Sequence, residues 1–521
     1  MTADILVGID AGTSVLKAVA FRLDGTPIAV AALPNHYSPV EDGGVEQDIA
    51  RTWADAVRAL RDLADAVPHL AGRLAAIAVT GQGDGTWLVD GSGAPVAPAW
   101  LWLDARATGI AETVRAGPNE ATRFAATGTG LAACQQGPQL AWMRRHRPAM
   151  LEAAATAFHC KDWLYLCLSG ERATDPSEAA LSFGDFRTRD YAAAAIESLG
   201  LHGIERLLPP IVDGTRHHGL LTDAAARQTG LRAGTPVVLG YIDIVCSALG
   251  AGLYDRTPEA GCTILGSTGL HMRLARSADA VELPADRTGY TICFPAPDAY
   301  AQLQSNLAAT LNIDWVLNLI AGVLASDGTS RSRDELIGRL DSIVESAAPG
   351  TLLYHPYIAE GGERGPFLDG AARAGFYGLS SRHGHADLVR SVVEGLCFAA
   401  RDCYEAMGAV PREVRVSGGA TRSRTLRTIL SAVLDAPVRP SGRAEAGAAG
   451  AAMIAAVSLG LYPDMAACAA AWVAPLLGPA EPPDAALAAR YRSLFPSYRE
   501  ARRAMTPVWR GLAHHRTRTH A

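Results

Sequence analysis

The 521 residues of the chain exceed what one hydrophobic core usually supports, so the length predicts two domains. A hydrophobic content of 49%, a charged content of 19% and a mean hydropathy of +0.09 exclude a disordered chain and indicate a globular protein. The net charge of −6 disfavours nucleic acid as a partner, because a nucleic-acid backbone must be neutralised by cationic side chains.

The cysteines and the apolar segments bear on where the protein works. The nine cysteines form neither a CxxC pair nor a cluster with histidine at zinc spacing, which is typical of a reducing cytoplasm. The first residues lack the features of a signal peptide. The apolar stretch 446–461 is too short to span a bilayer, and its alanines and glycines predict a buried helix packed against a sheet. We therefore expect a cytoplasmic protein without a membrane partner.

The chain opens with two strand-like runs, 5–9 and 15–21, joined by the turn DAGTS. Consecutive N–H groups and hydroxyls in such a turn can face a phosphate, as backbone nests do. Asp10 at the end of the first run would be an outer ligand for Mg²⁺, which prefers carboxylate and water oxygens. An ordinary surface hairpin remains the alternative for this stretch taken alone.

The pattern of the first half restarts near residue 255. The segment GCTILGSTGLHMRLA again joins two apolar runs by a turn of glycine and hydroxyl residues. The other predicted strands are 26–33, 74–82, 289–296 and 300–304, the predicted helices are 48–67 and 312–324, and 413–433 is a strand, glycine turn and helix. This order indicates a mixed α/β sheet in each half. Unless the recurrence is accidental, two like domains would face one nucleotide across a cleft.

Nucleotide motifs of other classes, namely GxxxxGK[ST], a helix-opening GxGxxG and the protein-kinase signatures, are absent from the sequence. Instead GIDAGTS, TGQGDG, WLDAR, GYIDIVCSALGAG, ILGSTG, GERGP, VSGGATRS and EAGAAGAA follow one another between about residues 5 and 460. With these motifs in this order the chain resembles the FGGY carbohydrate kinases, relatives of actin and hexokinase. The fuller stretches VGIDAGTSVLKAVAF, TGQGDGTWLVD, HCKDWLYL and ATDPSEA are similar to the erythritol kinases of that family.

The resemblance implies an α/β fold with two ribonuclease-H-like domains of the actin and hexokinase type around a central cleft. Residues 1–250 would bind the acceptor and carry the first phosphate hairpin, and residues 251–521 would bind ATP. It also implies Mg²⁺ in the cleft, phosphorylation of a terminal hydroxyl of a small polyol or sugar, most specifically erythritol to erythritol 4-phosphate, and it is compatible with a homodimer.

On the nucleotide side, the family's motifs place the metal-associated acid at Asp10. The residues that the resemblance assigns to ATP are Gly12, Thr13, Ser14 and Lys17 in the first hairpin, Gly266, Ser267 and Thr268 in the second, and Gly418, Gly419 and Ser423 near adenine and ribose. The second hairpin reads Gly-Ser-Thr where the family usually reads Gly-Thr-Ser, so which hydroxyl reaches the γ-phosphate stays open.

Asp243 in GYIDIVCSALG matches the catalytic base of the family and a second metal-associated acid. An acid within an apolar run is costly unless it is paired or functional. The alternative is a buried acid that caps the following helix.

The candidate acceptor-binding residues combine carboxylates and amides, which bond hydroxyls, with an aromatic face that covers carbon atoms. They are Gln82, Asp84, Trp102, Asp104, Gln135 and Asp243, with Gln136 as a weaker candidate. Trp102 could instead be a core residue, and Arg106 could pair structurally with Asp104. Glu363 and Arg364 of the GER loop are interpreted as structural.

Two alternative functions remain. The acceptor could be xylulose, glycerol or another sugar or polyol. The chain could also be an actin-like ATPase or a sensor scaffold, although Asp243 and the acceptor segment 81–106 speak against this.

Overall fold

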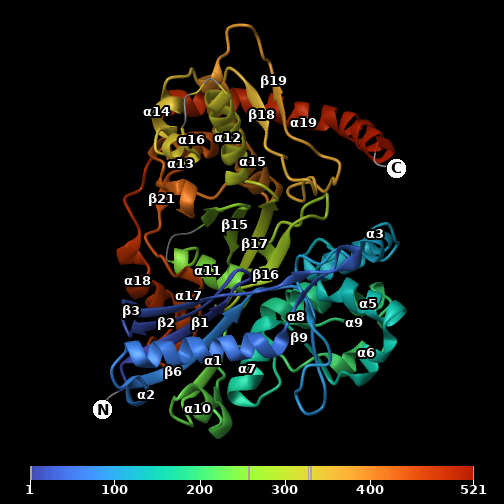
Figure 1. Ribbon diagram of the computed structural model, residues 1–521, viewed down its shortest axis with the longest axis vertical. Coiled ribbons are helices and arrows are strands. Elements are labelled where there is room, and N and C mark those ends of the chain that lie inside the picture. Colours follow the sequence, from blue (N-terminus) through green and yellow to red (C-terminus); the bar gives the residue numbers. More distant parts are fainter. Residues whose placement is uncertain (1–2, 256–258, 327, 329–330, 520–521) are drawn as a thin grey trace.

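The computed structural model describes residues 3–255, 259–326, 328 and 331–519. Each half of the chain builds one six-stranded sheet, and the two sheets lie one above the other in Figure 1. Smaller sheets and helices surround them.

The first sheet has the order β12-β13-β6-β1-β2-β3. Its strands are β1 (Ile5–Ala11), β2 (Val15–Arg22), β3 (Pro27–Pro34), β6 (Leu74–Gly81), β12 (Gly219–Leu220) and β13 (Pro236–Leu239). Strands β1, β2 and β3 are antiparallel, whereas β6 and β13 continue the sheet in parallel with β1. Asp10 and Lys17 are opposite each other in the β1–β2 hairpin, so the DAGTS turn closes it as predicted.

The second sheet repeats this arrangement, with the order β16-β17-β15-β14-β20-β21. Its strands are β14 (Ala260–Leu265), β15 (Gly269–Ala275), β16 (Tyr290–Cys293), β17 (Tyr300–Asn306), β20 (Glu413–Ser417) and β21 (Val438–Pro440). Again three antiparallel strands, β14, β15 and β17, are followed by two parallel ones, β20 and β21. The predicted duplication is confirmed, and β16 is the extra edge strand of this copy.

Amphipathic helices cover the outer face of each sheet. Helix α1 (Ile49–Ala66) begins at its predicted cap, where Asp48 accepts a hydrogen bond from Arg51 N, and it buries Leu60 and Leu63. The other helices on these faces are α7 (Cys160–Ser169) in the first half, and α15 (His385–Ala406) and α16 (Arg424–Leu434) in the second. Helices α10 (Asp223–Thr229), α12 (Thr310–Ser326) and α19 (Ala485–Thr519) pack outside them.

Helices α11 (Asp243–Ala251) and α17 (Ala446–Ser458) lie between the two sheets. Both are rich in alanine and glycine, and a Cβ atom on Gly450 would overlap the carbonyl oxygen of Cys246. A Cβ atom on Gly8 would likewise overlap the carbonyl of Ala448, so α17 packs directly on β1. The predicted buried helix is thus confirmed, and it joins both sheets into one continuous core.

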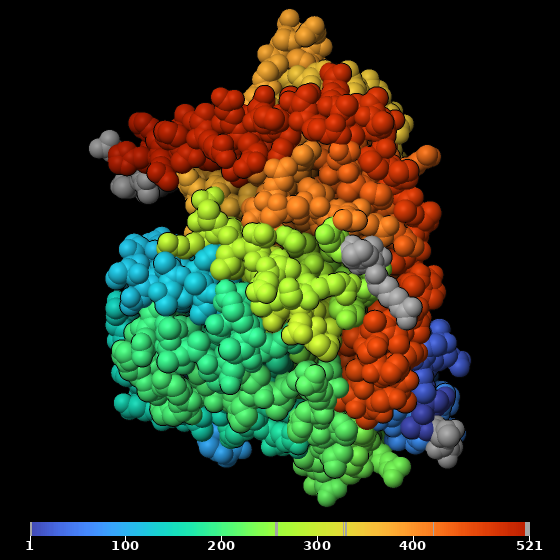
Figure 2. All heavy atoms as spheres, turned by 180° about the vertical axis from the view of Figure 1, so that it is seen from behind, coloured from blue at the N-terminus to red at the C-terminus, as the bar shows by residue number. Residues whose placement is uncertain are grey.

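The segment after α17 also returns to the first half. Helix α18 (Met465–Trp472) carries Trp472, whose Nε1 donates to Leu23 O at 2.9 Å and whose ring packs on Phe21. From behind, Figure 2 shows the orange-red surface of this segment beside the blue N-terminal hairpin. The division of the chain at residue 250 remains a prediction.

A group of helices is inserted between β6 and β12 and forms a small core of its own around Trp100, Leu140 and Leu201. It contains α3 (Thr108–Arg115), α4 (Glu120–Thr127), α5 (Gln136–His146), α6 (Pro148–Ala153), α8 (Pro176–Phe183) and α9 (Ala193–Ser198). No helix in the described part of the chain is long and apolar enough to cross a membrane.

The remaining elements are short. Within the described residues they are β4 (Ser38–Pro39), β5 (Val45–Gln47), β7 (Trp87–Val89), β8 (Ala99–Trp100), β9 (Thr156–Phe158), β10 (Gly184–Asp185), β11 (Asp190–Tyr191), β18 (Leu353–His355), β19 (Gly375–Tyr377), α2 (Leu70–Arg73), α13 (Arg333–Ile337), α14 (Leu340–Glu345) and five single turns of 3₁₀ helix.

Candidate active site

A cavity of about 180 Å³ lies between the two halves and receives side chains from both. The first half contributes Thr13, Gln82, Gly83, Asp84, Trp102, Leu181, Ile242, Asp243 and Ile244, and the second half contributes Thr268, Leu270, Tyr290, Ile292, Leu303, Ser305 and Arg364. We call it the acceptor cavity, after the ligand that the sequence leads us to expect at several of its residues. Its wall combines aliphatic side chains with a few hydroxyl, amide and charged groups, the usual composition of a small-molecule site.

Asp243 reaches this cavity because it is the first residue of α11, directly after the turn that follows β13. Burial and, to a smaller extent, the nearby carboxylate of Asp10 raise the pKa of Asp243 to about 8. The hydrogen bond from the Ile244 N–H acts in the opposite direction and lowers this pKa. A carboxylate with a pKa near neutrality is suited to accept a proton from a substrate. The N-cap position of α11 is Ile242, so the alternative of Asp243 as the helix cap finds no support.

Asp10 lies at the end of β1, against the beginning of α17. Burial raises its pKa to about 6, while Lys17 lowers it. A Cβ atom on Gly447 would overlap the Asp10 carboxylate, so this glycine is what allows the close approach. The Lys17 ammonium lies 2.8 Å from Glu445, just before α17, rather than in a cavity.

The two acids at β1 and α11 fit a hard cation. Burial and the Asp10 carboxylate raise the pKa of Asp243, and burial raises the pKa of Asp10. A divalent cation beside the two carboxylates would offset both effects. Among the residues that the structure describes, no three His, Cys, Asp or Glu side chains cluster as a metal site. An ion held by one or two carboxylates, waters and substrate phosphates is the usual arrangement of Mg²⁺.

A chain of hydrogen bonds fixes the polar wall of the acceptor cavity. Trp102 Nε1 donates to Thr13 Oγ1 at 2.7 Å, and the Thr13 hydroxyl donates to Gln82 Oε1 at 3.1 Å. Gln82 Nε2 in turn donates to Gln47 Oε1 at 2.9 Å. The sequence assigned Thr13 to phosphate and Trp102 and Gln82 to the acceptor, and the structure brings all three together at one wall.

Asp84 stands in a left-handed turn, with φ of 54°, between Gly83 and Gly85. Its Oδ1 is buried and accepts no hydrogen bond from the described part of the chain. Burial raises the pKa of Asp84, whereas His159 and Arg364 lower it. This oxygen is therefore available to a hydroxyl group placed in the cavity.

The GER loop supplies one wall residue from the second half. Glu363 holds the loop, because its Oε1 accepts from Leu307 N at 3.0 Å and from Arg364 N at 2.8 Å. Arg364 itself lines the cavity, where its Nη2 donates to Ser305 Oγ at 2.8 Å. The structural interpretation thus fits Glu363, while Arg364 faces the same space as Asp84.

A second cavity, of about 520 Å³, lies on the far side of the β14–β15 turn. We call it the nucleotide cavity, after the ligand that the sequence leads us to expect there. It is lined by Leu265, Gly266, Ser267, Thr310, Ile313, Asp314, Arg333, Ile337, Gly338, Leu340, Asp341, Gly419, Arg422 and Ser423. The two hydroxyls of the turn diverge, since Ser267 lines the nucleotide cavity and Thr268 lines the acceptor cavity.

The glycine turn after β20 forms another side of the nucleotide cavity. Gly418 has φ of +96°, and a Cβ atom there would overlap the Leu265 carbonyl, so the turn lies against the end of β14. Ser423 is the N-cap of α16: its hydroxyl oxygen accepts from Leu426 N at 3.0 Å, and its O–H donates to Asp341.

Several predicted residues line neither cavity. Asp104 is buried and fully bonded, to Val45 N at 2.9 Å and to Arg106 Nη2 at 2.6 Å, which favours the structural alternative for this pair. Gln135 donates to Gly130 O at 2.9 Å inside the helical insertion. The others are Asp10, Gly12, Ser14, Lys17, Gln136 and Gly418.

Other lining residues had not been expected. Tyr290 and Ser305 come from β16 and β17, and Asp341 and Arg333 from the helices after α12. The strand pattern of 289–296 and 300–304 was visible in the sequence, but alternation alone does not tell which face of a strand meets another sheet.

Comparisons with known proteins agree with this geometry. The N-terminal domain model of the FGGY family of carbohydrate kinases matches residues 5–250, and the C-terminal domain model matches residues 261–459. The erythritol kinase of Brucella abortus (strain 2308) is 56% identical over 510 residues, which cover 98% of each chain. The xylulose kinase of Escherichia coli (strain K12) is 28% identical over 431 residues, covering 82% of this chain and 84% of the relative.

Among solved structures, the xylulose kinase from Rhodospirillum rubrum matches with a TM-score of 0.87 and 28% identity, over 97% of this chain and 100% of that one. The chain therefore belongs to the FGGY family of carbohydrate kinases. The resemblance drawn from its motifs is confirmed, and so is the expected fold with two α/β domains.

Proposed function

We propose that this protein transfers the γ-phosphoryl group of ATP to a terminal hydroxyl of erythritol, giving erythritol 4-phosphate and ADP. The observation that carries the proposal is the acceptor cavity, which places the Asp243 carboxylate in a small, largely apolar space with a few hydroxyl-binding groups. The 56% identity to an erythritol kinase over nearly the whole chain supports erythritol over other acceptors.

In this proposal the acceptor lies between Asp243 at one end and Asp84 with Arg364 at the other. Asp84 Oδ1 accepts a hydrogen bond from a distal hydroxyl, and Arg364 donates to a hydroxyl oxygen. Trp102 covers the carbon atoms of the acceptor. Asp104 and Gln135 then support this wall from outside the cavity instead of contacting the acceptor.

Asp243 accepts the proton of the terminal hydroxyl while the oxygen attacks the γ-phosphorus in line. The new O–P bond forms as the bond to the ADP oxygen breaks, and the proton later passes from Asp243 to solvent. Phosphoryl transfer depends mainly on positioning and on charge stabilisation, so one well-placed carboxylate suffices as the base. The hydroxyl of Thr268, in the turn between the two cavities, would donate to the transferring group.

The nucleotide cavity would hold ATP, with Ser267 and Gly266 toward the phosphates and Gly419 and Ser423 toward adenine and ribose. Gly418 would act indirectly, by letting the turn lie against the end of β14. The turn of Gly12, Thr13 and Ser14 would face the phosphates from the first half. Asp10 and Asp243 would hold Mg²⁺, and that ion would supply positive charge near the phosphates. Lys17 would then contribute to the ATP site indirectly, through its ion pair with Glu445.

The remaining expectations belong to the same proposal: an acceptor domain at 1–250, an ATP domain at 251–521, a cytoplasmic location and a homodimer. An actin-like ATPase or sensor scaffold is the competing class. Such a protein has no need of a carboxylate base in a second cavity, which is why we favour the kinase.

A substrate panel tests the proposal. ADP release is followed with Mg-ATP and erythritol, xylulose or glycerol, and without any acceptor. We expect the largest kcat/KM with erythritol and a far lower rate without an acceptor, because a positioned hydroxyl outcompetes water. Equal ADP release in the presence and absence of every acceptor would support the ATPase class, and a preference for xylulose or glycerol would correct the acceptor.

A further inference from the structure

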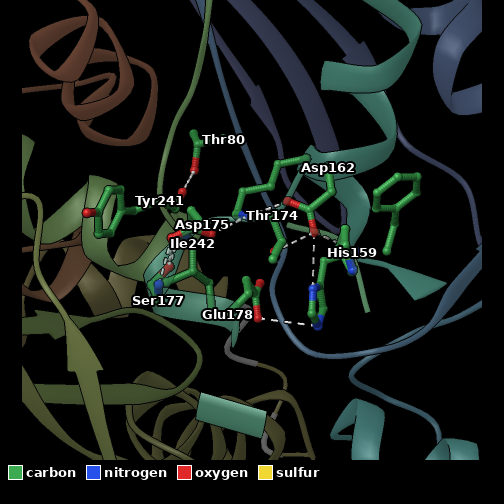
Figure 3. Close-up of polar contacts among 12 residues, drawn as sticks. Thr80, His159, Asp162, Thr174, Asp175, Ser177, Glu178, Tyr241 and Ile242 are labelled. Atoms are coloured by element: carbon green, nitrogen blue, oxygen red, sulfur yellow. Dashed lines mark hydrogen bonds and ion pairs between the residues drawn. The ribbon is translucent and has the colours of Figure 1, made fainter. Parts of the chain in front are cut away.

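Behind the wall of the acceptor cavity lies a buried group of charged side chains to which the mechanism above gives no role (Figure 3). It lies at the N-terminal ends of α7 and α8, where the HCKDWLYL and ATDPSEA motifs begin these helices. Lys161 Nζ lies 2.6 Å from Asp162 Oδ1 and 2.5 Å from Asp175 Oδ2, and all three side chains are 0% exposed. We call these three residues the buried ion cluster.

The charges of Lys161 and Asp162 persist despite burial. Burial opposes the charged form of Asp162, but Lys161 holds the pKa of this carboxyl at about 2. Burial likewise opposes the charged ammonium of Lys161, but Asp162 and Asp175 raise its pKa above the usual value. Buried ion pairs add little net stability, because desolvation offsets their attraction. A role in stability alone therefore explains the cluster poorly.

The cluster is connected to the backbone beside Asp243 through Ser177. The Ser177 hydroxyl donates to Asp175, and its oxygen accepts a hydrogen bond from Ile242 N at 3.0 Å. On the other side, Thr80 Oγ1 donates to Tyr241 O at 2.6 Å. The Tyr241 carbonyl and the Ile242 N–H belong to one peptide unit, so Ser177 and Thr80 hold the same peptide plane from its two ends.

This peptide plane is one residue away from the Asp243 Cα atom. A rotation of the plane would turn the first residue of α11 and move its carboxylate within the acceptor cavity. Ile242 is itself a lining residue, so the same rotation would change the shape of the wall. The hydroxyl of Ser177 is in turn oriented by Asp175, whose position depends on Lys161.

We propose that Ser177, oriented by Asp175 and Lys161, is a positioning residue for Asp243 and, together with Thr80, fixes the peptide plane that aims its carboxylate at the acceptor hydroxyl. The proposal rests on the function proposed for Asp243. It gives Asp175 and Ser177 of the ATDPSEA motif a part in positioning the base, although neither side chain reaches the acceptor cavity.

The test compares Ser177→Ala with Thr174→Val as a matched control. Thr174 Oγ1 donates to Asp162 Oδ2 at 3.0 Å, so this control also removes one buried hydroxyl from the same neighbourhood without a bond to the 241–242 peptide. We expect Ser177→Ala to lower kcat by about 10- to 100-fold, the cost of a small misplacement of a reacting group. Dissociation constants for erythritol and Mg-ADP, measured by calorimetry, should stay within about twofold. Thr174→Val should keep kcat within about twofold at a similar loss of thermal stability.

A double-mutant cycle with Asp243→Asn separates positioning from a general structural effect. If Ser177 acts through Asp243, adding Ser177→Ala to Asp243→Asn should change kcat by less than about threefold. Should Ser177→Ala not fold, Thr80→Val, which releases the other end of the peptide plane, replaces it in the same cycle. Equal losses of kcat in both backgrounds, or wild-type kcat in a folded Ser177→Ala, would overturn the proposal. Wild-type kcat in Asp243→Asn would instead overturn the proposed base, so the two failures are distinguishable.

Discussion

At the scale of single residues, the acids of this protein differ in their surroundings more than their sequence contexts suggest. Asp104 is buried with a full set of partners around Arg106, whereas Asp84 keeps one oxygen without a partner in the described structure. Asp243 has a pKa raised to about 8 by burial and by Asp10. Only acids that are left with unused bonding capacity can serve a substrate, which is why Asp84 and Asp243 are the stronger candidates.

The sharpest prediction at this scale concerns Asp243→Asn, which keeps the shape of the side chain but cannot accept a proton. We expect kcat to fall by about 10²- to 10⁴-fold, the range of a positioned general base, while both substrates still bind. Calorimetry with erythritol and with Mg-ADP measures binding directly, because KM need not equal Kd when rates change. A folded variant that retains more than about a third of wild-type kcat would rule out the role.

At the scale of elements, the β14–β15 turn divides its two hydroxyls between the two cavities. We expect Ser267→Ala to raise the KM for ATP by about tenfold, equivalent to about 1.4 kcal/mol, and to leave the KM for erythritol unchanged within about twofold. Thr268→Val is the matched control, and it should change kcat or the KM for erythritol instead of the KM for ATP. Steady-state kinetics with each substrate varied in turn checks both. The same effect from both variants would mean that the two hydroxyls serve one ligand.

The contact between α11 and α17 provides a second prediction for elements. In Gly450→Ala the new methyl group would overlap the Cys246 carbonyl, so the two helices must separate, at a cost of about 1–3 kcal/mol. Gly322→Ala in α12 is the control, because no atom lies within 4 Å of its added Cβ, and it should be neutral or slightly stabilising. Thermal melts of the two variants should therefore shift in opposite directions or by clearly different amounts. An unchanged melting temperature for Gly450→Ala would contradict the close packing.

At the scale of the whole molecule, a buried histidine couples stability to pH. His271 lies 3.2 Å from Thr263 Oγ1 through Nδ1 and 3.0 Å from Asn306 Oδ1 through Nε2, and Tyr404 OH lies 2.8 Å from Thr263 Oγ1. These contacts join β14, β15, β17 and α15. Because Asn306 Oδ1 can only accept, Nε2 carries the proton, and the neutral ring is bonded at both nitrogens.

Burial lowers the pKa of His271 to about 4, although Asn306 opposes the shift. Between about pH 6.5 and pH 4 the unfolded chain binds more protons at this residue than the folded chain, so stability falls as the pH drops through this window. From pH 7 to pH 5 we expect His271 to remove about 2 kcal/mol from the free energy of unfolding. Urea midpoints of wild type and His271→Gln at both pH values check this, since the variant should lose less. Parallel losses in the two proteins would exclude His271 as the cause.

The local elements of this protein follow from its sequence alone. The hairpins, the capped helix α1, the buried helix α17 and the repeated strand order were predicted, because hydrophobic period and turn residues act over stretches of a few to about twenty residues. The motifs in the turns likewise led to the family, since they keep their order along the chain.

Only the packing of the two halves decided which residues meet. Glu445 pairs with Lys17 across 428 positions, α17 returns to the first sheet, and Arg364 and Tyr290 reach a cavity whose other wall is built by Thr13 and Asp84. Neighbouring hydroxyls at Ser267 and Thr268 serve different cavities for the same reason. Such contacts depend on how two sheets and the helices between them fit in three dimensions. The sequence around a side chain does not determine which distant surface that side chain will contact.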